Sequence, residues 1–159
     1  MRELKLPDTF NIPEEFVTPD FYFRPLRFSD IDEDYAAVMS SIDIINKARG
    51  DGGGWPDPAM TREENHRDLG WHDKEFEDRS SFAYIAFSAD KTEYLGCFYF
   101  YPPGTRGTES GAGDVDVSFW VTQKAYDAGC YATLYSAIGD FLKLWPFDAV
   151  VFTNEFMPE

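Results

Sequence analysis

The sequence predicts an α/β (α+β) fold in which helices flank a mixed, mostly antiparallel sheet. Its composition is that of a globular domain, because 43% of the residues are hydrophobic and 18% are aromatic, which is enough for a substantial core. β-rich runs and amphipathic segments follow one another as strand, helix, helix, three strands, helix and strand. We therefore expect residues 1–159 to form a single domain.

The first elements are marked by proline, aromatic and capping residues. Residues 1–19 hold three of the ten prolines and are expected to form an extended arm. The aromatic run 21–28 predicts the first strand, and Pro25 within it predicts an edge or a bulge. Ser29, followed by acidic residues, predicts the N-cap of a helix over residues 31–45.

A second helix is predicted after a loop. Residues 49–58 are rich in glycine and proline and form that loop, without the Gly-Lys-Ser/Thr that a nucleotide-binding P-loop needs. Thr61 and Glu64 make a capping box for a helix over residues 61–79. One face of this helix is semi-apolar and is expected to pack on the sheet, with Asn65, Leu69, His72 and Phe76 in one row.

The next segment predicts a hairpin and a further strand. The runs 81–89 and 93–102 are separated by only three residues, which is typical of a hairpin, and their aromatic content implies that both sheet faces are covered. Residues 102–113 form a polar, Gly-rich loop. Alternation in residues 114–121 then predicts a strand that has Asp116, Ser118 and Trp120 on one face.

The chain closes with a helix and a last strand. The helix is expected from about residue 131 to residue 145, with its apolar stripe in the core, and the strand over residues 147–153. Gly139 lies inside this helix, where glycine costs about 1 kcal/mol relative to alanine. We therefore expect close backbone packing at Gly139.

Charge and composition exclude several classes of function. The formal net charge is −15, with 14 basic against 29 acidic side chains, so nucleic acid and anionic membranes are not expected as partners. No apolar run approaches the roughly 18 residues of a membrane span, and the first residues do not resemble a signal peptide. We expect a cytoplasmic protein, in which Cys97 and Cys130 are reduced thiols.

Metal and nucleophilic chemistry have little support in the sequence. His66 and His72 lack the spacing of a metal-binding helix, so we expect no metal site. Cys130 has no evident base partner. A phosphorylated ligand fits better, because the strand that ends at Val121 is followed by a small-residue turn and a helix N-terminus, whose backbone N–H groups are unpaired.

Residues 20–154 resemble the GNAT-type N-acetyltransferases, in element order and in the stretch FWVTQKAYDAGCYATL. A small branch of such proteins is resembled by FRPLRFSDID, the WP at Trp55, N-x-x-DL-x-x-H at Asn65 to His72, SFAY, LGCFYFYPP, FWV and WPF. The resemblance implies that acetyl-CoA is the co-substrate and that a splayed strand and the following helix admit its pantetheine arm. The cofactor-binding positions that it implies are Trp120, Val121, Ala128, Gly129, Cys130, Tyr131, Ala132 and Thr133.

The chain departs from the family pattern in two places. Asp127 stands where the family has arginine or glutamine, and Cys130 and Ala132 occupy its two small positions. Because two charges 4 Å apart repel by about 1 kcal/mol in water and about 4 kcal/mol near a protein surface, the resemblance requires the Asp127 carboxylate to point away from the cofactor. The family also continues with another helix and two strands beyond the last strand expected here.

The resemblance also implies which residues carry the chemistry. Asp116 corresponds to the position of a general base, and Tyr131 is a candidate acid for the departing thiolate. Trp55, His72 and Tyr99 are expected at the binding site of the acceptor, a small-molecule amine.

Two other functions remain open. The chain could be a catalytically inactive GNAT-like protein that binds another ligand or a partner; an exposed edge near residues 147–153 leads us to expect a homodimer. Alternatively, the small, acidic, aromatic-rich chain could form a cone-shaped α+β fold that binds a small molecule, although such a fold has no helix near residue 135.

Overall fold

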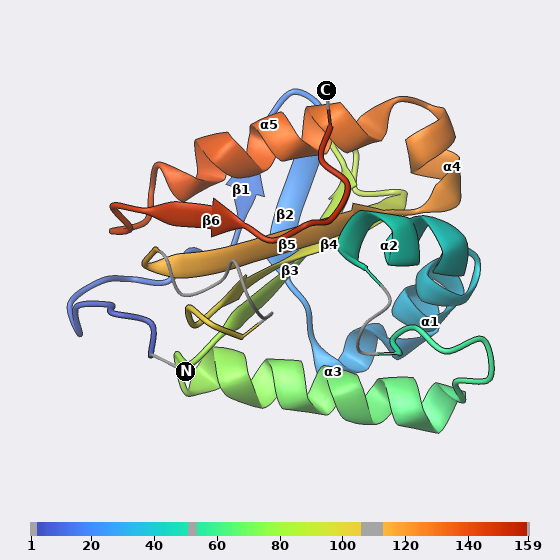
Figure 1. Ribbon diagram of the computed structural model, residues 1–159, viewed down its shortest axis with the longest axis horizontal. Coiled ribbons are helices and arrows are strands. Elements are labelled where there is room, and N and C mark those ends of the chain that lie inside the picture. Colours follow the sequence, from blue (N-terminus) through green and yellow to red (C-terminus); the bar gives the residue numbers. More distant parts are fainter. Residues whose placement is uncertain (1–2, 51–53, 106–112, 159) are drawn as a thin grey trace.

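A computed structural model describes residues 3–50, 54–105 and 113–158. Its centre is a six-stranded sheet with the strand order β1-β2-β3-β4-β5-β6 (Figure 1). All neighbouring strands are antiparallel except β5 and β6, which are parallel. The strands are β1 (Phe16–Val17), β2 (Phe21–Pro25), β3 (Phe82–Ser88), β4 (Tyr94–Tyr101), β5 (Val115–Val121) and β6 (Val150–Phe152). The predicted fold class and hairpin are confirmed.

Helices cover both faces of this sheet. In Figure 1 the long helix α5 lies over one face and α3 lies over the other, with α1 and α2 at the side where β5 ends. The helical elements are η1 (Phe28–Asp30), α1 (Ile31–Met39), α2 (Ile42–Arg49), α3 (Arg62–Glu77), α4 (Gln123–Asp127) and α5 (Cys130–Leu142). Among the described residues, no helix combines the length and the apolar character needed to cross a membrane.

The alternation of β5 divides the core into two clusters. Val117 and Phe119 join the cluster under α5, together with Leu134, Ile138 and Phe141 of that helix. Trp120 points to the opposite face and joins the cluster under α1 and α3. The face that bears Trp120 also carries Ser118 and Asp116, as the sequence predicted, and it is the face on which the candidate site forms.

The predicted first helix was wrong in two respects. It is broken between α1 and α2, where the Ser40 hydroxyl donates to the Ala37 carbonyl. Its start is not capped by Ser29: the carboxylate of Asp30 accepts the Arg27 N–H at 2.8 Å and pairs with Arg24 at 2.8 Å. An ion pair with Arg24 of β2 and a hydrogen bond from the Arg27 N–H thus fix the start of the helical region, in place of a serine cap.

The region after β5 also differs from the prediction. Residues expected to form a turn include the short helix α4, which Thr122 caps through its hydroxyl. The expectation of close packing at Gly139 was wrong, because a Cβ built there meets no atom within 4 Å. The last strand spans only Val150–Phe152.

The second predicted helix is confirmed, with the Thr61 hydroxyl accepting the Glu64 N–H at 3.2 Å.

Candidate functional site

The first part of the site is a gap at the end of β5, where β6 leaves its neighbour. The last paired residues are Val117 and Phe152. On the other edge of β5, the Thr122 N–H donates to Leu95 of β4 at 2.9 Å. Because backbone groups alternate along a strand, the N–H and C=O groups of Phe119 and Val121 point away from β4. They therefore face the gap.

A side chain takes the place of a strand partner in this gap. The Phe119 N–H donates to Asn154 Oδ1 at 3.0 Å, and Asn154 Nδ2 donates to the Phe119 carbonyl at 3.0 Å. Asn154 Nδ2 also donates to the Tyr131 hydroxyl at 2.7 Å. The amide of Asn154 thus satisfies both backbone groups of Phe119.

Residues 153–158, called here the C-terminal segment, extend this closure from α5 to α2. The N–H groups of Glu155 and Phe156 donate to the Ala48 carbonyl at 2.9 and 3.3 Å. The Tyr131 hydroxyl donates to the Phe156 carbonyl, and the two rings stack with their centres 5.4 Å apart. Lys47 Nζ lies 4.3 Å from the centre of the Phe156 ring. The gap is therefore covered by the chain's own residues.

Neither Asp127 nor Tyr126 closes the gap alone. Asp127 is exposed and its carboxylate accepts a hydrogen bond from Gln123 Nε2 at 3.0 Å, so it points back along α4. Tyr126 is half-buried, with its ring centre 5.8 Å from that of Tyr131. Burial raises the pKa of Tyr131 to about 12, so this hydroxyl stays protonated at neutral pH.

The start of α5 supplies unpaired donors beside the gap. Gly129 is the N-cap, with a left-handed φ of 86°, and a Cβ there would meet no atom within 4 Å. The next three N–H groups, of Cys130, Tyr131 and Ala132, precede the first intrahelical bond. The Ala128 and Gly129 N–H groups, by contrast, already bond to carbonyls of α4. Of the predicted turn amides, only those of Cys130, Tyr131 and Ala132 are available to an anion.

Other predicted residues lie on the face of β5 that bears Trp120. The Trp120 indole donates to the Tyr99 hydroxyl at 2.9 Å, and its backbone groups face β4, so it contributes nothing to the gap. Asp116 is fully buried, and its Oδ2 accepts the Gly104 N–H at 2.9 Å. Asp116 Oδ1 has no hydrogen-bond partner among the described residues.

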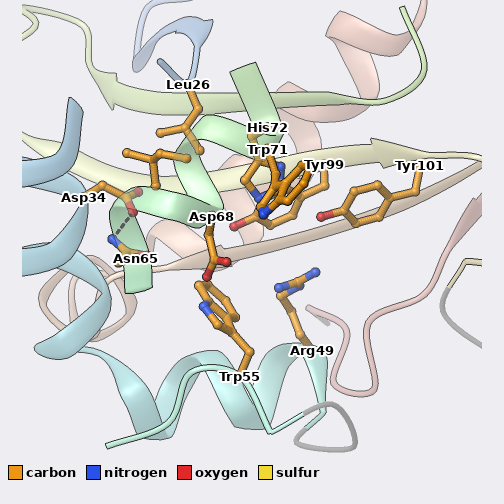
Figure 2. A pocket seen from close by; sticks show the side chains of 11 residues that line it. Leu26, Asp34, Arg49, Trp55, Asn65, Asp68, Trp71, His72, Tyr99 and Tyr101 are labelled. Carbon is orange, nitrogen blue, oxygen red and sulfur yellow. Dashed lines mark hydrogen bonds between the residues drawn. The ribbon is translucent and has the colours of Figure 1, made fainter. Parts of the chain in front are cut away.

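Trp55, His72 and Tyr99 come together in one cavity of about 310 Å³ (Figure 2). It lies between α3, the end of α2 and one face of β4. Its lining consists of Leu26, Asp34, Arg49, Trp55, Asn65, Asp68, Leu69, Trp71, His72, Tyr99 and Tyr101. The structure thus unites the three residues predicted for the acceptor site, although they are far apart in the sequence. Residues 51–53 of the predicted loop 49–58 and residues 106–112 of the predicted loop 102–113 lie outside the described residues.

Arg49 links this cavity to β5. Its Nε donates to the Ser118 hydroxyl at 3.3 Å, one residue before Phe119. Its guanidinium carbon lies 4.4 Å from the centre of the Tyr99 ring. The side chain is buried, and sequence reasoning missed it, because a single arginine at the end of a helix carries no signal of its own. Arg49 therefore lines the cavity and also contacts the strand whose end forms the gap.

His72 is held in its neutral form. Burial, and secondly the charge of Arg49, lower its pKa to about 4. A neutral imidazole can exchange hydrogen bonds with a ligand, but it is a weak base at neutral pH. The ring lies beside Tyr99, with their centres 5.5 Å apart.

This shift predicts how stability depends on pH. The unfolded His72 takes up a proton near pH 6.5, whereas the folded one does so near pH 4, so stability falls as the pH drops through that window. Between pH 7 and pH 5 the wild-type protein should lose about 2 kcal/mol more than His72→Gln. Urea denaturation of both proteins at several pH values measures this, and parallel profiles would contradict the shift. Both proteins have the same carboxyl groups, so the contribution of these groups to the pH dependence of stability cancels in the comparison.

Among the described residues, no group of three or more His, Cys, Asp and Glu side chains is arranged to hold a metal ion.

No protein-family model and no curated protein matches the sequence. Solved structures do. RimL, a ribosomal L7/L12 alpha-N-protein acetyltransferase in complex with coenzyme A, is similar over 80% of this chain and 66% of its own, with 12% identity and a TM-score of 0.60. The GNAT domain of PAT from S. lividans is similar over 84% and 75%, with 17% identity and a TM-score of 0.53.

A third solved structure is spermidine N-acetyltransferase from Vibrio cholerae in complex with CoA and spermine. It is similar over 76% of this chain and 62% of its own, with 12% identity and a TM-score of 0.52. The chain thus spans about two thirds of the length of the structures that it matches. These similarities show a GNAT-type fold, so the cone-shaped alternative was wrong.

Proposed function

We propose that this chain, with its GNAT-type fold, is an N-acetyltransferase that transfers an acetyl group from acetyl-CoA to a small amine. The observation that carries the proposal is the pairing of two features beside β5. One is a strand edge next to the unpaired N–H groups at the start of α5; the other is a cavity that reaches β5 through Arg49. The first suits an extended phosphorylated cofactor, and the second suits an acceptor.

The residues present fit the cofactor. The N–H groups of Cys130, Tyr131 and Ala132 would hold the pyrophosphate at the helix N-terminus, where the exposed Gly129 leaves room. The backbone of Val121 faces the gap, and none of the hydrogen bonds among the described residues engages it. Val121 would therefore bond to an amide of the pantetheine arm. When bound, acetyl-CoA supplies the activated acyl group.

The chain's own residues would manage the protons of the transfer. Attack by the amine on the thioester carbonyl forms the C–N bond, breaks the C–S bond and releases a thiolate. Asp116, with Oδ1 unpartnered, is our candidate to take up the ammonium proton. Tyr131 borders the gap and is our candidate to protonate the thiolate.

Titration calorimetry with acetyl-CoA tests the proposal. We expect binding in the micromolar range. Gly129→Glu should weaken it at least about fivefold, because the new charge repels the pyrophosphate and because glutamate is strained in the left-handed backbone conformation of this position. Gly139→Glu is the matched control, since it makes the same change on the same helix at a site that also has no atom within 4 Å. Equal effects of the two variants would contradict this mode of binding.

One observation favours the inactive alternative. The C-terminal segment covers the gap and satisfies Phe119. Absence of heat at millimolar acetyl-CoA would favour a GNAT-like protein that binds a different ligand or a partner. The homodimer and the cytoplasmic location stay predictions.

A further inference from the structure

The cavity in Figure 2 contains a buried polar atom that lacks a partner. Asp34, only 3% exposed, accepts from the Tyr94 hydroxyl at 2.5 Å and from Asn65 Nδ2 at 2.9 Å. Because both oxygens of Asp34 accept hydrogen bonds, the NH₂ group of Asn65 faces this carboxyl group. Asn65 Oδ1 is left buried and without a partner among the residues that the structure describes. A hydrogen-bond donor on a ligand would satisfy it.

A second acceptor lies on the same helix. Asp68 follows Asn65 by three residues on α3, so both side chains are on one face of the helix and both line the cavity. In Figure 2 the Asp68 carboxylate points across the cavity toward Trp55. Asp68 brings carboxylate oxygens to the cavity, and the unpartnered Asn65 Oδ1 is buried in its wall, which favours a ligand with N–H donors.

Aromatic rings enclose the space beside these acceptors. Trp55, Tyr99 and Tyr101 line it, and Trp71 borders it although 61% of that residue is exposed. The guanidinium of Arg49 already lies over two of the rings, 4.4 Å from the centre of Tyr99 and 5.5 Å from that of Trp55. The walls therefore suit cations, which aromatic faces attract. The net charge of −15 favours the approach of a cation as well.

We infer that this cavity binds an organic cation through Asn65 and Asp68 and that, on the function proposed above, the cation is the non-reacting nitrogen of a diamine substrate. The two ends of the cavity differ in the way that such a substrate needs. The α3 end holds a charged nitrogen, whereas the end at β5 holds Arg49, whose charge favours the neutral form of a nearby amine. Only a neutral amine attacks a thioester.

The binding part can be tested without the cofactor. Calorimetric titration of the full chain with 1,4-diaminobutane should give binding at least about tenfold tighter than with n-butylamine, and 1-butanol should bind weakest. Asp68→Asn should weaken diamine binding about tenfold while the monoamine changes less. Asp140→Asn is the matched control, because it removes the same charge from an exposed position on α5.

A second measurement separates this inference from the proposed function. Acetyl transfer to 1,4-diaminobutane should have a KM at least about tenfold lower than transfer to n-butylamine, and Asp68→Asn should abolish that preference with little change in kcat. Transfer to both amines with equal KM would overturn the inference and leave the transferase standing. Diamine binding that depends on Asp68, in a protein that does not bind acetyl-CoA, would support the cation site and overturn the transferase. Diamine binding unaffected by Asp68→Asn would overturn the cation site.

Discussion

Replacing Phe141 by alanine should lower the free energy of unfolding by about 4 kcal/mol. Phe141 is fully buried on α5. Its ring contacts six other aromatic rings with centres 5.0–6.0 Å away, those of Phe16, Phe23, Tyr84, Phe98, Phe100 and Trp145. Removal leaves a cavity that these rigid rings cannot fill by relaxing. The expected loss of stability therefore has two parts: the hydrophobic free energy of burying the phenyl ring, and the cost of the cavity that its removal leaves.

Urea denaturation followed by tryptophan fluorescence measures this loss. Phe28→Ala is the control, because Phe28 is 48% exposed and stacks on His66 at the surface; it should cost less than about 1 kcal/mol. Similar losses in the two variants would contradict the central place of Phe141 in the core.

Much of the fold was predictable from local patterns. The alternation around Trp120 and the hairpin spacing are properties of neighbouring residues, and the structure follows both. The helix start at Asp30 was missed because Asp30 is fixed by Arg24, a partner on a strand. The prediction of close packing at Gly139 was wrong because a helix tolerates an exposed glycine at modest cost, even where no neighbouring segment packs against it.

The candidate site was only partly predictable, for the same reason. Trp55, His72 and Tyr99 were predicted with the help of a family resemblance, and the cavity unites them. Arg49 reaches Ser118, which is 69 residues away in the sequence. Asn154 reaches Phe119 across 35 residues. Contacts over such distances depend on the assembled sheet, so no local pattern indicates them.

Replacing Phe156 by alanine should tighten acetyl-CoA binding about 20-fold if the pantetheine arm uses the edge of β5 that the C-terminal segment now covers. The segment must then leave before the arm enters, and the apparent dissociation constant rises as the open fraction falls. Phe156 helps to hold the segment closed through Tyr131 and Lys47. The alanine variant loses the ring stacking on Tyr131 and the contact with Lys47 but keeps Asn154 and the backbone hydrogen bonds of residue 156, so opening becomes easier.

Calorimetric titration of the wild type, Phe156→Ala and Leu144→Ala with acetyl-CoA decides the point. Leu144 is 53% exposed just beyond the end of α5, so its variant should bind as the wild type does. Weaker binding by Phe156→Ala would mean that the segment stays in place and helps to hold the cofactor. Unchanged binding would mean that the arm takes a path outside the gap, since an equilibrium that does not involve the segment is not moved by loosening it.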